Sequence, residues 1–351
     1  MPHTVHAQAP GRVNLIGEHT DYNGGFVLPA AIPQRTHVEL TRVDGHEVEV
    51  HSATLGATER YRLGAEQPGR GWLDYVQGIT AIVSSAGYRL GGFTARIESN
   101  VPLGSGLSSS AALEISLLNA LRDAFGLALS GEDMARLGQR AENEFVGAPV
   151  GIMDQMAAVF ADESHALFLD TRTLAYERVP IPASAALLVI NSGVEHQHVG
   201  GDYRTRRAEC ERAAALLGVP QLRDLDAVDL PRIGRLPDPL SRRARHVVTE
   251  DARVLETVAA LRGGDLASAG RLFSASHASM RDDFDVSVPA VDSLVAIAEA
   301  EPAVYGARLT GGGFGGSIVA LARPEDARAA AERIAAVYSQ QSGNRATVLV
   351  P

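Results

Sequence analysis

The chain reads Gly104-Ser105-Gly106-Leu107-Ser108-Ser109-Ser110-Ala111 at the junction of two predicted elements. An alternating run from Phe93 to Val101 predicts a strand before it, and an apolar periodicity from Ala111 to Phe125 predicts a helix after it. Glycines let a backbone approach a ligand closely, and the free N–H groups and dipole of a helix N-terminus favour negative charge. The segment therefore predicts an anion site, for which a nucleotide phosphate is the natural guest.

A bound phosphate would need its negative charge offset by groups other than lysine, because the chain contains none. The segment lacks the Gly-Lys-Ser/Thr of a Walker A loop, and all 32 basic residues of the chain are arginines. The net charge of -10 argues against a nucleic-acid or anionic-membrane partner, since either would require a basic face.

Length and composition predict a large folded protein. The 351 residues, 45% of them hydrophobic, suggest about two domains of roughly 150 residues each. The single cysteine, Cys210, cannot form an internal disulfide, which fits a reducing cytoplasm. We expect no signal peptide and no membrane span, because no charged leader and no apolar run of about 18 residues occurs.

The remaining patterns predict a β-rich first third, helical middle sections and a mixed C-terminal part. Alternating runs on either side of Asp44-Gly45 predict a hairpin, at residues 36–42 and 47–52. Other predicted elements are a helix over 72–86, helices between 111 and 160 and between 203 and 300, and short strands at 166–169 and 187–191. The C-terminal part reads strand, glycine loop, strand, helix, strand, at 304–310, 311–316, 317–322, 324–338 and 346–350.

A polar cluster follows an apolar strand near the start of the chain. Glu18, His19 and Asp21 lie within four residues, and such a group can hydrogen-bond several hydroxyls of a polyol. A polar turn with solvated charges is an equally open reading. Zinc is disfavoured because no second His or Cys stands at ligand spacing.

Three further features of the sequence each allow a functional and a purely structural interpretation. Asp154 begins a predicted helix, where it either favours the first turn or acts as a catalytic carboxylate. The glycine run 311–316 predicts a close backbone approach to a ligand or another loop, with a flexible linker as the alternative. His196 and His198 alternate on one segment, but a metal site would need a third ligand that the sequence does not offer.

Taken in this order, these segments resemble the GHMP small-molecule kinases, and within them the galactokinase family. The run from Gly11 to Gly25, with its Glu-His-Thr-Asp at 18–21, resembles the motif specific to galactokinases. The loop from Gly104 to Ala111 resembles the family's phosphate-binding motif, and residues 311–316 resemble its third motif. The similarity spans nearly the whole chain.

The resemblance implies an α+β fold of two lobes with the active site in the cleft between them. The N-terminal lobe, residues 1–180, would hold a mixed sheet and helices, and the C-terminal lobe, residues 181–351, would be ferredoxin-like. The N-terminal lobe would also contain a left-handed βαβ crossover, against the usual right-handed rule.

The resemblance also implies roles for individual residues. Asp154 would be the catalytic carboxylate, with Arg12 beside it keeping it ionised or stabilising the transferring phosphoryl group. The implied sugar contacts are Arg12, Glu18, His19, Asp21, Gly151, Asp154 and Tyr203. The implied ATP contacts are the loop 104–111 with Trp72 and Tyr75, although ordinary helix packing explains both aromatics nearly as well. Ser110 and Glu142 would hold Mg²⁺.

The implied reaction converts ATP and D-galactose into galactose 1-phosphate and ADP, in a cytoplasmic monomer with no nucleic-acid or membrane partner. One alternative is a related sugar 1-kinase for arabinose, galacturonic acid or N-acetylgalactosamine. Another is a non-catalytic sensor that binds galactose and ATP, although the complete loop 108–112 and the presence of Asp154 favour an enzyme. A mevalonate- or homoserine-type kinase fits the loop but not the Glu-His-x-Asp run.

Overall fold

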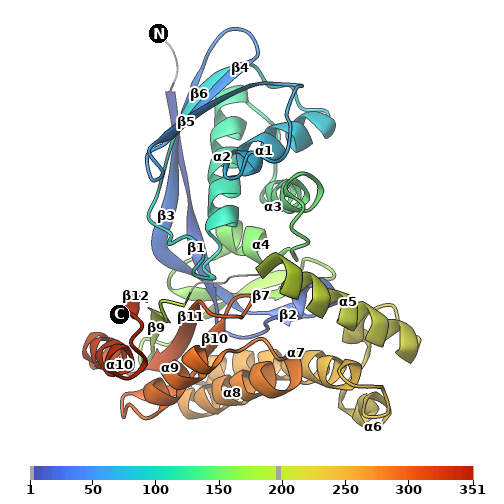
Figure 1. The fold of residues 1–351 in the computed structure, drawn as a ribbon, viewed down its shortest axis with the longest axis vertical. Coiled ribbons are helices and arrows are strands. Elements are labelled where there is room, and N and C mark those ends of the chain that lie inside the picture. Colours follow the sequence, from blue (N-terminus) through green and yellow to red (C-terminus); the bar gives the residue numbers. More distant parts are fainter. Residues whose placement is uncertain (1–3, 195–198, 351) are drawn as a thin grey trace. The chain divides into compact units, whose positions relative to one another are not determined.

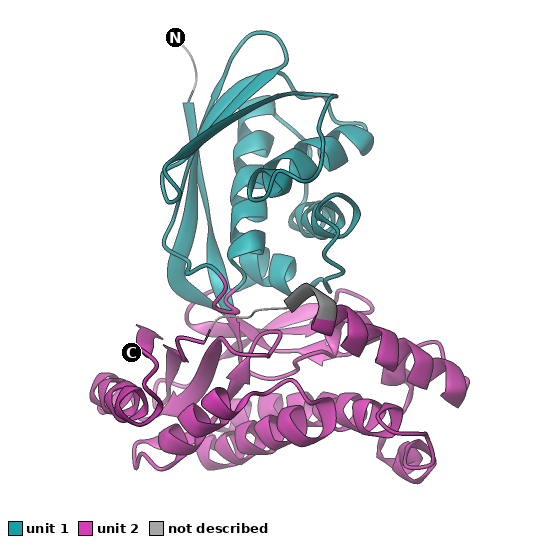
Figure 2. Ribbon diagram, in the orientation of Figure 1, with its two compact units in different colours: residues 1–12, 31–103, 108–161 teal, residues 13–30, 104–107, 162–351 magenta. Residues whose placement is uncertain are grey.

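The computed structural model describes residues 4–194 and 199–350 (Figure 1). His196 and His198 lie outside these residues. The chain divides into two compact units that interleave in sequence (Figure 2). Unit 1 comprises residues 1–12, 31–103 and 108–161, and unit 2 comprises residues 13–30, 104–107 and 162–351. The lobe boundary at about residue 180 stays a prediction.

Unit 1 is built on a mixed sheet. The strands are β1 (Thr4–Asn14), β3 (Pro29–Arg42), β4 (Glu47–Ser52), β5 (Ala57–Arg62) and β6 (Phe93–Ser99). Along the sheet the order is β3-β6-β4-β5, with β1 paired to β3. Burial alternates along β6, so that Phe93, Ala95 and Ile97 face the core while the residues between them face outward.

Helices cover one face of this sheet (Figure 1). They are α1 (Leu73–Ser85), α2 (Ser109–Phe125), α3 (Gly131–Arg140), the π-helical turn η2 (Ala141–Val146) and α4 (Met153–Phe160). Apolar side chains of α1, α2 and α3 pack with those of β3, β4 and β6 in one core. This arrangement confirms the predicted strand, loop and helix around residues 93–125.

The predicted hairpin at Asp44-Gly45 is wrong. Strand β6 lies between β3 and β4, antiparallel to the first and parallel to the second. The turn instead pairs with the residue that precedes β6, because Gly92 N–H donates to Gly45 O at 2.8 Å and Gly92 O accepts from Val43 N–H at 2.9 Å. Asp44-Gly45 does form a turn, as its residue types predict, but β6 inserts between the two strands that the turn was expected to pair.

Unit 2 contains a four-stranded antiparallel sheet. Its strands are β9 (Ala186–Asn191), β10 (Val304–Thr310), β11 (Ser317–Ala322) and β12 (Thr347–Val350). The order β10-β11-β9-β12 is that of a βαββαβ ferredoxin-like unit, with helices α5 to α9 inserted after β9. This confirms the predicted ferredoxin-like part and its strand order. Three short strands, β2 (Phe26–Val27), β7 (His165–Asp170) and β8 (Tyr176–Pro180), belong to the same sheet as β3. Strand β7 pairs with β2 and β8, and it meets the start of β3 through Ala30 and Ala166.

The helices of unit 2 are α5 (Val199–Leu217), α6 (Leu230–Ile233), α7 (Leu240–Gly263), α8 (Leu266–Ser279), α9 (Pro289–Glu299) and α10 (Ala327–Ser342). Helices α8, α9 and α10 pack on the four-stranded sheet, α7 packs on α8, and α5 and α6 pack on α7. Short turns are the 3₁₀ helices η1 (Asp21–Asn23), η3 (Leu222–Asp224) and η4 (Ala227–Asp229), and the π-helical η5 (Met280–Phe284). Helices α7 and α8 run side by side, and α8 packs on β10 (Figure 1). Among the described residues, no helix has the length and apolar character to span a membrane.

Candidate active site

Asp154 is engaged on both carboxylate oxygens. It stands in the first turn of α4, and Arg12 near the end of β1 donates Nε–H to its Oδ1 at 2.9 Å. Arg12 Nη2 lies 2.7 Å from the same oxygen, and the Ser108 hydroxyl donates to Oδ2. The arginine side chain is buried, whereas 26% of the Asp154 side chain is exposed. The structure therefore places an accessible carboxylate beside a buried cation.

Ser108 occupies the N-cap of α2 without capping it. Its backbone is left-handed, with φ 56°, and its side chain makes no capping hydrogen bond. The hydroxyl instead donates its hydrogen bond to Asp154. Because no side chain caps this end, the first N–H groups of α2 keep the character of an anion site.

A second carboxylate group lies next to Asp154. Glu142, on the π-helical turn η2, accepts hydrogen bonds from Ser110 and, at 2.9 Å, from Gln155 Nε2. Gln155 Nε2 also donates to Glu114 Oε2 at 3.0 Å. Burial raises the pKa of Glu142 to about 7, and the neighbouring Asp154 charge adds to the rise. Burial and the Glu142 charge raise the pKa of Glu114 well above its usual value.

Gly151 lies buried in the turn before α4. Asn143 braces this turn, since its Oδ1 accepts from Val150 N–H at 2.7 Å and its Nδ2 donates to Val150 O at 3.3 Å. Of the two predicted adenine-pocket aromatics, Trp72 packs partly buried against the core of unit 1. The pKa of Tyr75 rises to about 12 because of its burial and the charges of Glu142 and Glu114.

The glycine run 311–316 joins β10 to β11 and approaches the backbones of Gly106, Val194 and Val286 closely. A Cβ on Gly311 would lie 2.8 Å from Gly106 O, and one on Gly313 would lie 2.4 Å from Val286 O. Ser317 at the end of the run donates to Ser105 O at 2.8 Å. The run is therefore the predicted close approach to another loop, and the flexible-linker alternative is wrong. It supports residues 104–107 of the predicted phosphate loop.

Residues 17–21, here called the Glu-His turn, form a compact aromatic and polar group in unit 2. His19 has a left-handed φ of 63°, and its Nδ1 lies 2.9 Å from the Tyr22 hydroxyl. The His19 ring packs on Tyr203 of α5 and on Phe284, with centroids 5.4 and 4.6 Å apart. Burial, aided by His246, lowers the pKa of His19 to about 3, so the imidazole is neutral. Its Nε2 is buried, and no described residue meets it in full hydrogen-bond geometry, although the Gly312 backbone interacts with the ring and opposes the lowering of its pKa.

Asp21 ends the Glu-His turn and begins η1. Its carboxylate accepts from Tyr22 N–H at 2.9 Å, and its carbonyl accepts from the Thr171 hydroxyl at 3.0 Å. Asp21 is only partly buried, unlike Glu18 and His19. Backbone bonds thus fix its position while solvent still reaches it.

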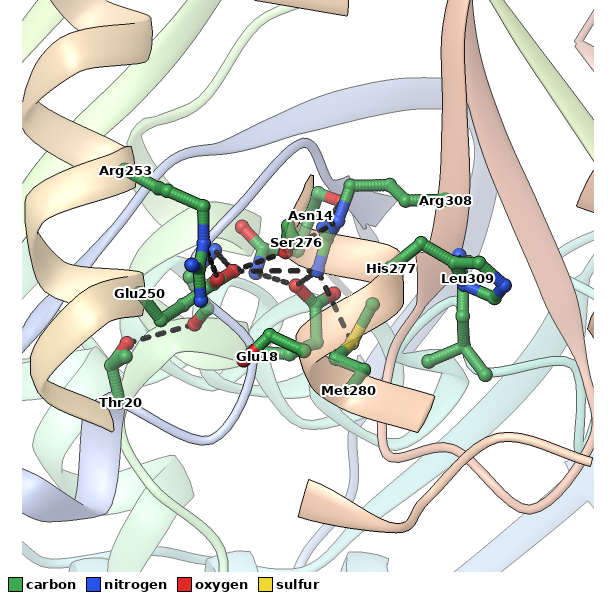
Figure 3. A network of polar contacts seen from close by, with 12 residues as sticks. Asn14, Glu18, Thr20, Glu250, Arg253, Ser276, His277, Met280, Arg308 and Leu309 are labelled. Atoms are coloured by element: carbon green, nitrogen blue, oxygen red, sulfur yellow. Dashed lines mark hydrogen bonds and ion pairs between the residues drawn. The ribbon is translucent and has the colours of Figure 1, made fainter. Parts of the chain in front are cut away.

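Glu18 is held in a fully buried network (Figure 3). Its Oε2 accepts from Asn14 Nδ2 at 2.9 Å and lies 2.5 Å from Arg308 Nη2. Its Oε1 accepts from Gly311 N–H at 2.9 Å. The Thr310 hydroxyl is 3.3 Å from Oε1 but donates to Asn14 O at the shorter distance of 2.9 Å. Oε1 therefore retains one acceptor position.

Helix α7 holds the same turn from its other side. Glu250 Oε1 accepts from Gly17 N–H at 3.0 Å, and Glu250 Oε2 accepts from Arg253 at 2.7 Å. Burial would raise the pKa of Glu250, but Arg253 and Arg308 outweigh it and lower that pKa to about 2. One turn earlier, His246 Nε2 lies 3.1 Å from Glu18 O.

The predicted residues fall into two groups, each brought together within one unit. Unit 1 assembles Arg12, Ser108, Ser109, Ser110, Ala111, Glu142, Gly151, Asp154, Trp72 and Tyr75. Unit 2 assembles Glu18, His19, Asp21, Tyr203 and the loop residues 104–107. Their roles in binding and catalysis stay predictions.

The sequence analysis missed Arg308, His246 and Glu250. Arg308 interrupts an otherwise apolar strand, and such a buried charge signals a specific partner. His246 and Glu250 stand four residues apart in a helix, which places them on one face. Both patterns are visible in the sequence, but neither identifies Glu18 or Gly17 as the residue contacted.

Three family models match the chain. They are the galactokinase galactose-binding signature at residues 2–42, the GHMP kinases N terminal domain at residues 74–162, and the GHMP kinases C terminal model at residues 257–340. The mevalonate kinase of Methanococcus jannaschii has the same fold, with a TM-score of 0.72 at 18% identity over 99% of this chain and 98% of that one. The chain is thus a GHMP kinase by fold and by sequence.

More similar relatives narrow the family. A galactokinase of Streptomyces coelicolor is 48% identical over 322 residues, covering 89% of this chain and 83% of the relative. A galactokinase of Roseiflexus sp. is 43% identical over 356 residues, covering 99% and 91%. The structure of Lactococcus lactis galactokinase complexed with galactose superposes with a TM-score of 0.94 at 34% identity, covering 99% and 92%. Within the GHMP kinases, the chain belongs to the galactokinase family.

Proposed function

We propose that this chain transfers the γ-phosphoryl group of ATP to the C1 hydroxyl of D-galactose, giving galactose 1-phosphate and ADP. The observation that carries the proposal is the accessible Asp154 carboxylate, fixed by the buried Arg12 and by Ser108, in a chain whose residues 2–42 match the galactose-binding signature. Phosphoryl transfer needs mainly positioning and charge stabilisation, because its transition state is loose.

Asp154 would accept the proton of the C1 hydroxyl. Its Oδ1 accepts from Arg12, while its Oδ2 accepts from the hydroxyl of Ser108. A sugar hydroxyl can therefore share Oδ2 with Ser108. Arg12 fixes the orientation of the carboxylate and supplies positive charge near the oxygen that attacks.

The phosphates of ATP would be bound without lysine. The N–H groups at the start of α2, Ser109 to Ala111, face no capping side chain, and the helix dipole favours an anion there. Trp72, the N-cap residue of α1, and Tyr75 in its first turn are proposed to bind the adenine. Loss of ATP affinity in Tyr75→Ala, with the sugar KM unchanged, is the result that supports this assignment.

The residues present fit Mg²⁺. Glu142 and Ser110 offer hard oxygen ligands, and Mg²⁺ commonly uses one or two protein oxygens together with substrate phosphates and water. Burial raises the pKa of Glu142 to about 7 and the charge of Asp154 adds to the rise, and a bound divalent cation would offset both effects by favouring the ionised carboxylate. When bound, the ion would neutralise charge on the transferring phosphates.

The Glu-His turn and Tyr203 would bind the sugar. The neutral His19 has a buried Nε2 that makes no hydrogen bond of full geometry among the described residues, with the Gly312 backbone near the ring, and Glu18 Oε1 retains an acceptor position. Such groups discriminate against an epimer with a misplaced hydroxyl, because they would be left unpaired. Gly151, in the braced turn before α4, is proposed to contact the sugar through its backbone.

A substrate panel tests the proposal. ADP release is followed with ATP and Mg²⁺ on galactose, glucose, arabinose, galacturonic acid and N-acetylgalactosamine, and phosphorus NMR locates the product phosphate. Selective turnover of galactose with phosphate on C1 is the expected result. Turnover of another sugar would move the substrate and keep the mechanism, and binding of galactose and ATP without ADP release would indicate a sensor.

The proposed setting is a cytoplasmic monomer. Cys210 is free and buried, and burial raises its pKa to about 12, so the thiol is inert. A single unreactive thiol suits a reducing compartment. Light scattering at assay concentrations should give the mass of one chain, and a dimer mass would contradict the monomer.

A further inference from the structure

We propose that His246 and Arg308 are positioning residues that set sugar affinity by holding the two ends of Glu18, its main-chain carbonyl and its carboxylate. The inference rests on the proposed sugar kinase function. It assigns a role to two residues that lie more than two hundred positions after Glu18 in the sequence.

The Glu-His turn cannot hold its own shape by local preference. Gly17 and His19, on either side of Glu18, both have left-handed backbones, with φ values of 100° and 63°. A left-handed conformation is unfavourable for a non-glycine residue such as His19. A Cβ at Gly17 would lie 2.6 Å from Phe26 O, so the chain is also confined there. Local hydrogen bonds hold part of the turn, such as that from the Thr20 hydroxyl to Gly17 O at 2.8 Å, and contacts from elsewhere in unit 2 hold Glu18.

Arg308 supplies the contact to the carboxylate. It is fully buried on β10, and its guanidinium reaches the segment before the turn through Leu15 O at 2.9 Å and Asn14 O at 3.3 Å (Figure 3). Its Nη2 lies 2.5 Å from Glu18 Oε2. The planar guanidinium therefore fixes the Glu18 carboxylate relative to the main chain of residues 14 and 15.

Other neighbours fix the guanidinium of Arg308 in turn. Its Nε donates to Ser276 Oγ at 3.2 Å, and Glu250 Oε1 lies 3.6 Å from Nη2. Glu250 is ionised, and it also accepts from Gly17 N–H. Two carboxylates thus compensate the buried charges of Arg308 and Arg253, and a buried cation with such partners has one stable orientation.

His246 supplies the contact to the carbonyl, and its tautomer follows from its neighbours. Burial lowers the pKa of His246 to about 4, so the ring is neutral at pH 7. Glu18 O can only accept, so Nε2 must carry the proton and donate across the 3.1 Å contact. Nδ1 then accepts from the Ser279 hydroxyl at 2.9 Å. The ring also packs on Phe284, which packs on His19.

A matched pair of amide variants tests His246. In His246→Gln the side-chain amide reaches the position of Nε2 and can still donate to Glu18 O. In His246→Asn the shorter amide reaches only the position of Nδ1, so the contact to Ser279 can remain and the contact to Glu18 O is lost. We expect His246→Asn to raise the galactose KM and the calorimetric Kd about tenfold, with kcat and the ATP KM within about twofold. His246→Gln should stay within about threefold of the unmodified chain.

A double-mutant cycle tests that the effect passes through Glu18. Galactose Kd is measured for Glu18→Ala, His246→Asn and the double variant. If His246 acts by positioning Glu18, the asparagine change should weaken binding by less than about twofold in the Glu18→Ala background. Additive losses would overturn the proposal.

Arg308→Lys tests the second contact, because lysine keeps the charge but cannot reproduce the guanidinium fork. If that variant does not fold, Ser276→Ala removes the acceptor of Arg308 Nε and leaves the ion pair to Glu18 in place. Either variant should raise the galactose KM with little change in the ATP KM. Unchanged galactose KM in the folded variant would overturn the role of Arg308.

Val248→Ala is the control for loss of packing on the same helix. Val248 is buried in the core of unit 2, so its truncation destabilises the unit without removing a polar contact to the Glu-His turn. A galactose KM that rises as much in Val248→Ala as in His246→Asn would overturn the proposal. If the substrate panel selects another sugar, the same variants are measured with that sugar, and a chain that binds no sugar would overturn both this inference and the proposed function.

Discussion

The role of Asp154 cannot be inferred from its own position in the sequence. In the sequence it reads equally well as a residue that favours the first turn of a helix. In the structure it keeps that place in α4, yet its two oxygens are bound by Arg12 and Ser108, which lie 142 and 46 residues away. The family resemblance could indicate that Arg12 and Asp154 belong together, but residue spacing could not, because the contact depends on the whole of unit 1.

Replacing Asp154 by Asn is expected to lower kcat by about a thousandfold or more, since a positioned base contributes typically 10²–10⁴-fold. The asparagine oxygen can still accept from Arg12, so the arrangement of the site should persist. Calorimetry should show galactose and ATP affinities within about threefold of the unmodified chain. Turnover close to that of the unmodified chain would remove Asp154 from its proposed role.

Helix α2 offers a prediction at the scale of the element. An N-cap serine normally contributes ~1 kcal/mol to stability, but Ser108 donates to Asp154 and caps nothing. Ser108→Ala should therefore change the free energy of unfolding by less than about 0.5 kcal/mol and lower kcat by about tenfold.

Helix α3 provides the matched control for this prediction. Ser130 forms a true capping box with Asp133, accepting from its N–H at 3.1 Å. Ser130→Ala should cost ~1 kcal/mol in urea denaturation and leave kcat unchanged. Equal losses of stability in the two variants would show that the Ser108 side chain does stabilise α2.

The glycine run yields a second prediction at this scale. Gly313 has φ 83° and no room for a Cβ, whereas Gly343 after α10 has φ 73° and no atom within 4 Å of the same position. Both alanine variants incur left-handed strain of about 1 kcal/mol. Only Gly313→Ala adds overlap with Val286 O, so it should lose a further ~1–3 kcal/mol in denaturation. Equal losses would indicate that Val286 shifts at no cost.

Elements were more predictable than their pairing. Periodicity and glycine breaks predicted α2, the helical character of residues 203–300 and the two strands around the glycine run, because these signals are local. Strand β8 was missed, since four of its five residues are exposed and its sequence shows little alternation. The false hairpin had good turn residues, but the pairing of β6 with both neighbours depends on α1, which returns the chain between them.

At the scale of the whole molecule, each of the two units buries ionisable residues that composition alone could not assign to a site. Each unit buries ionisable side chains in its interior, including Glu114 and Glu142 in unit 1 and Glu18, Glu250 and Arg308 in unit 2. Burial of this kind is set by packing between distant segments, which a sequence pattern does not encode. The resemblance could name several of these residues but not their protonation, which follows from desolvation and from neighbouring charges.

The effect of burial on protonation can be measured at Asp251 as a dependence of protein stability on pH. Its Oδ1 accepts from Phe26 N–H at 2.7 Å, and its Oδ2 is buried without a hydrogen-bond partner among the described residues. Burial raises its pKa to about 7, against the lowering effects of Phe26 N–H and Arg223. The folded chain then holds a proton that the unfolded chain releases near pH 4, so this group's contribution to stability is complete below pH 4 and is lost as the pH rises through about 7.

Asp251→Asn replaces the carboxyl by a neutral group of the same shape, and the amide oxygen can still accept from Phe26 N–H. Relative to the unmodified chain, the variant should be of similar stability at pH 4 and more stable at pH 8, by on the order of 2–4 kcal/mol. Urea denaturation of both chains between pH 4 and 8 measures this difference, and the other titrating groups cancel because both chains share them. A constant difference across the range would show that folding does not shift the pKa of Asp251. A variant that is less stable at pH 8 would show that the ionised carboxylate stabilises the fold through Arg223.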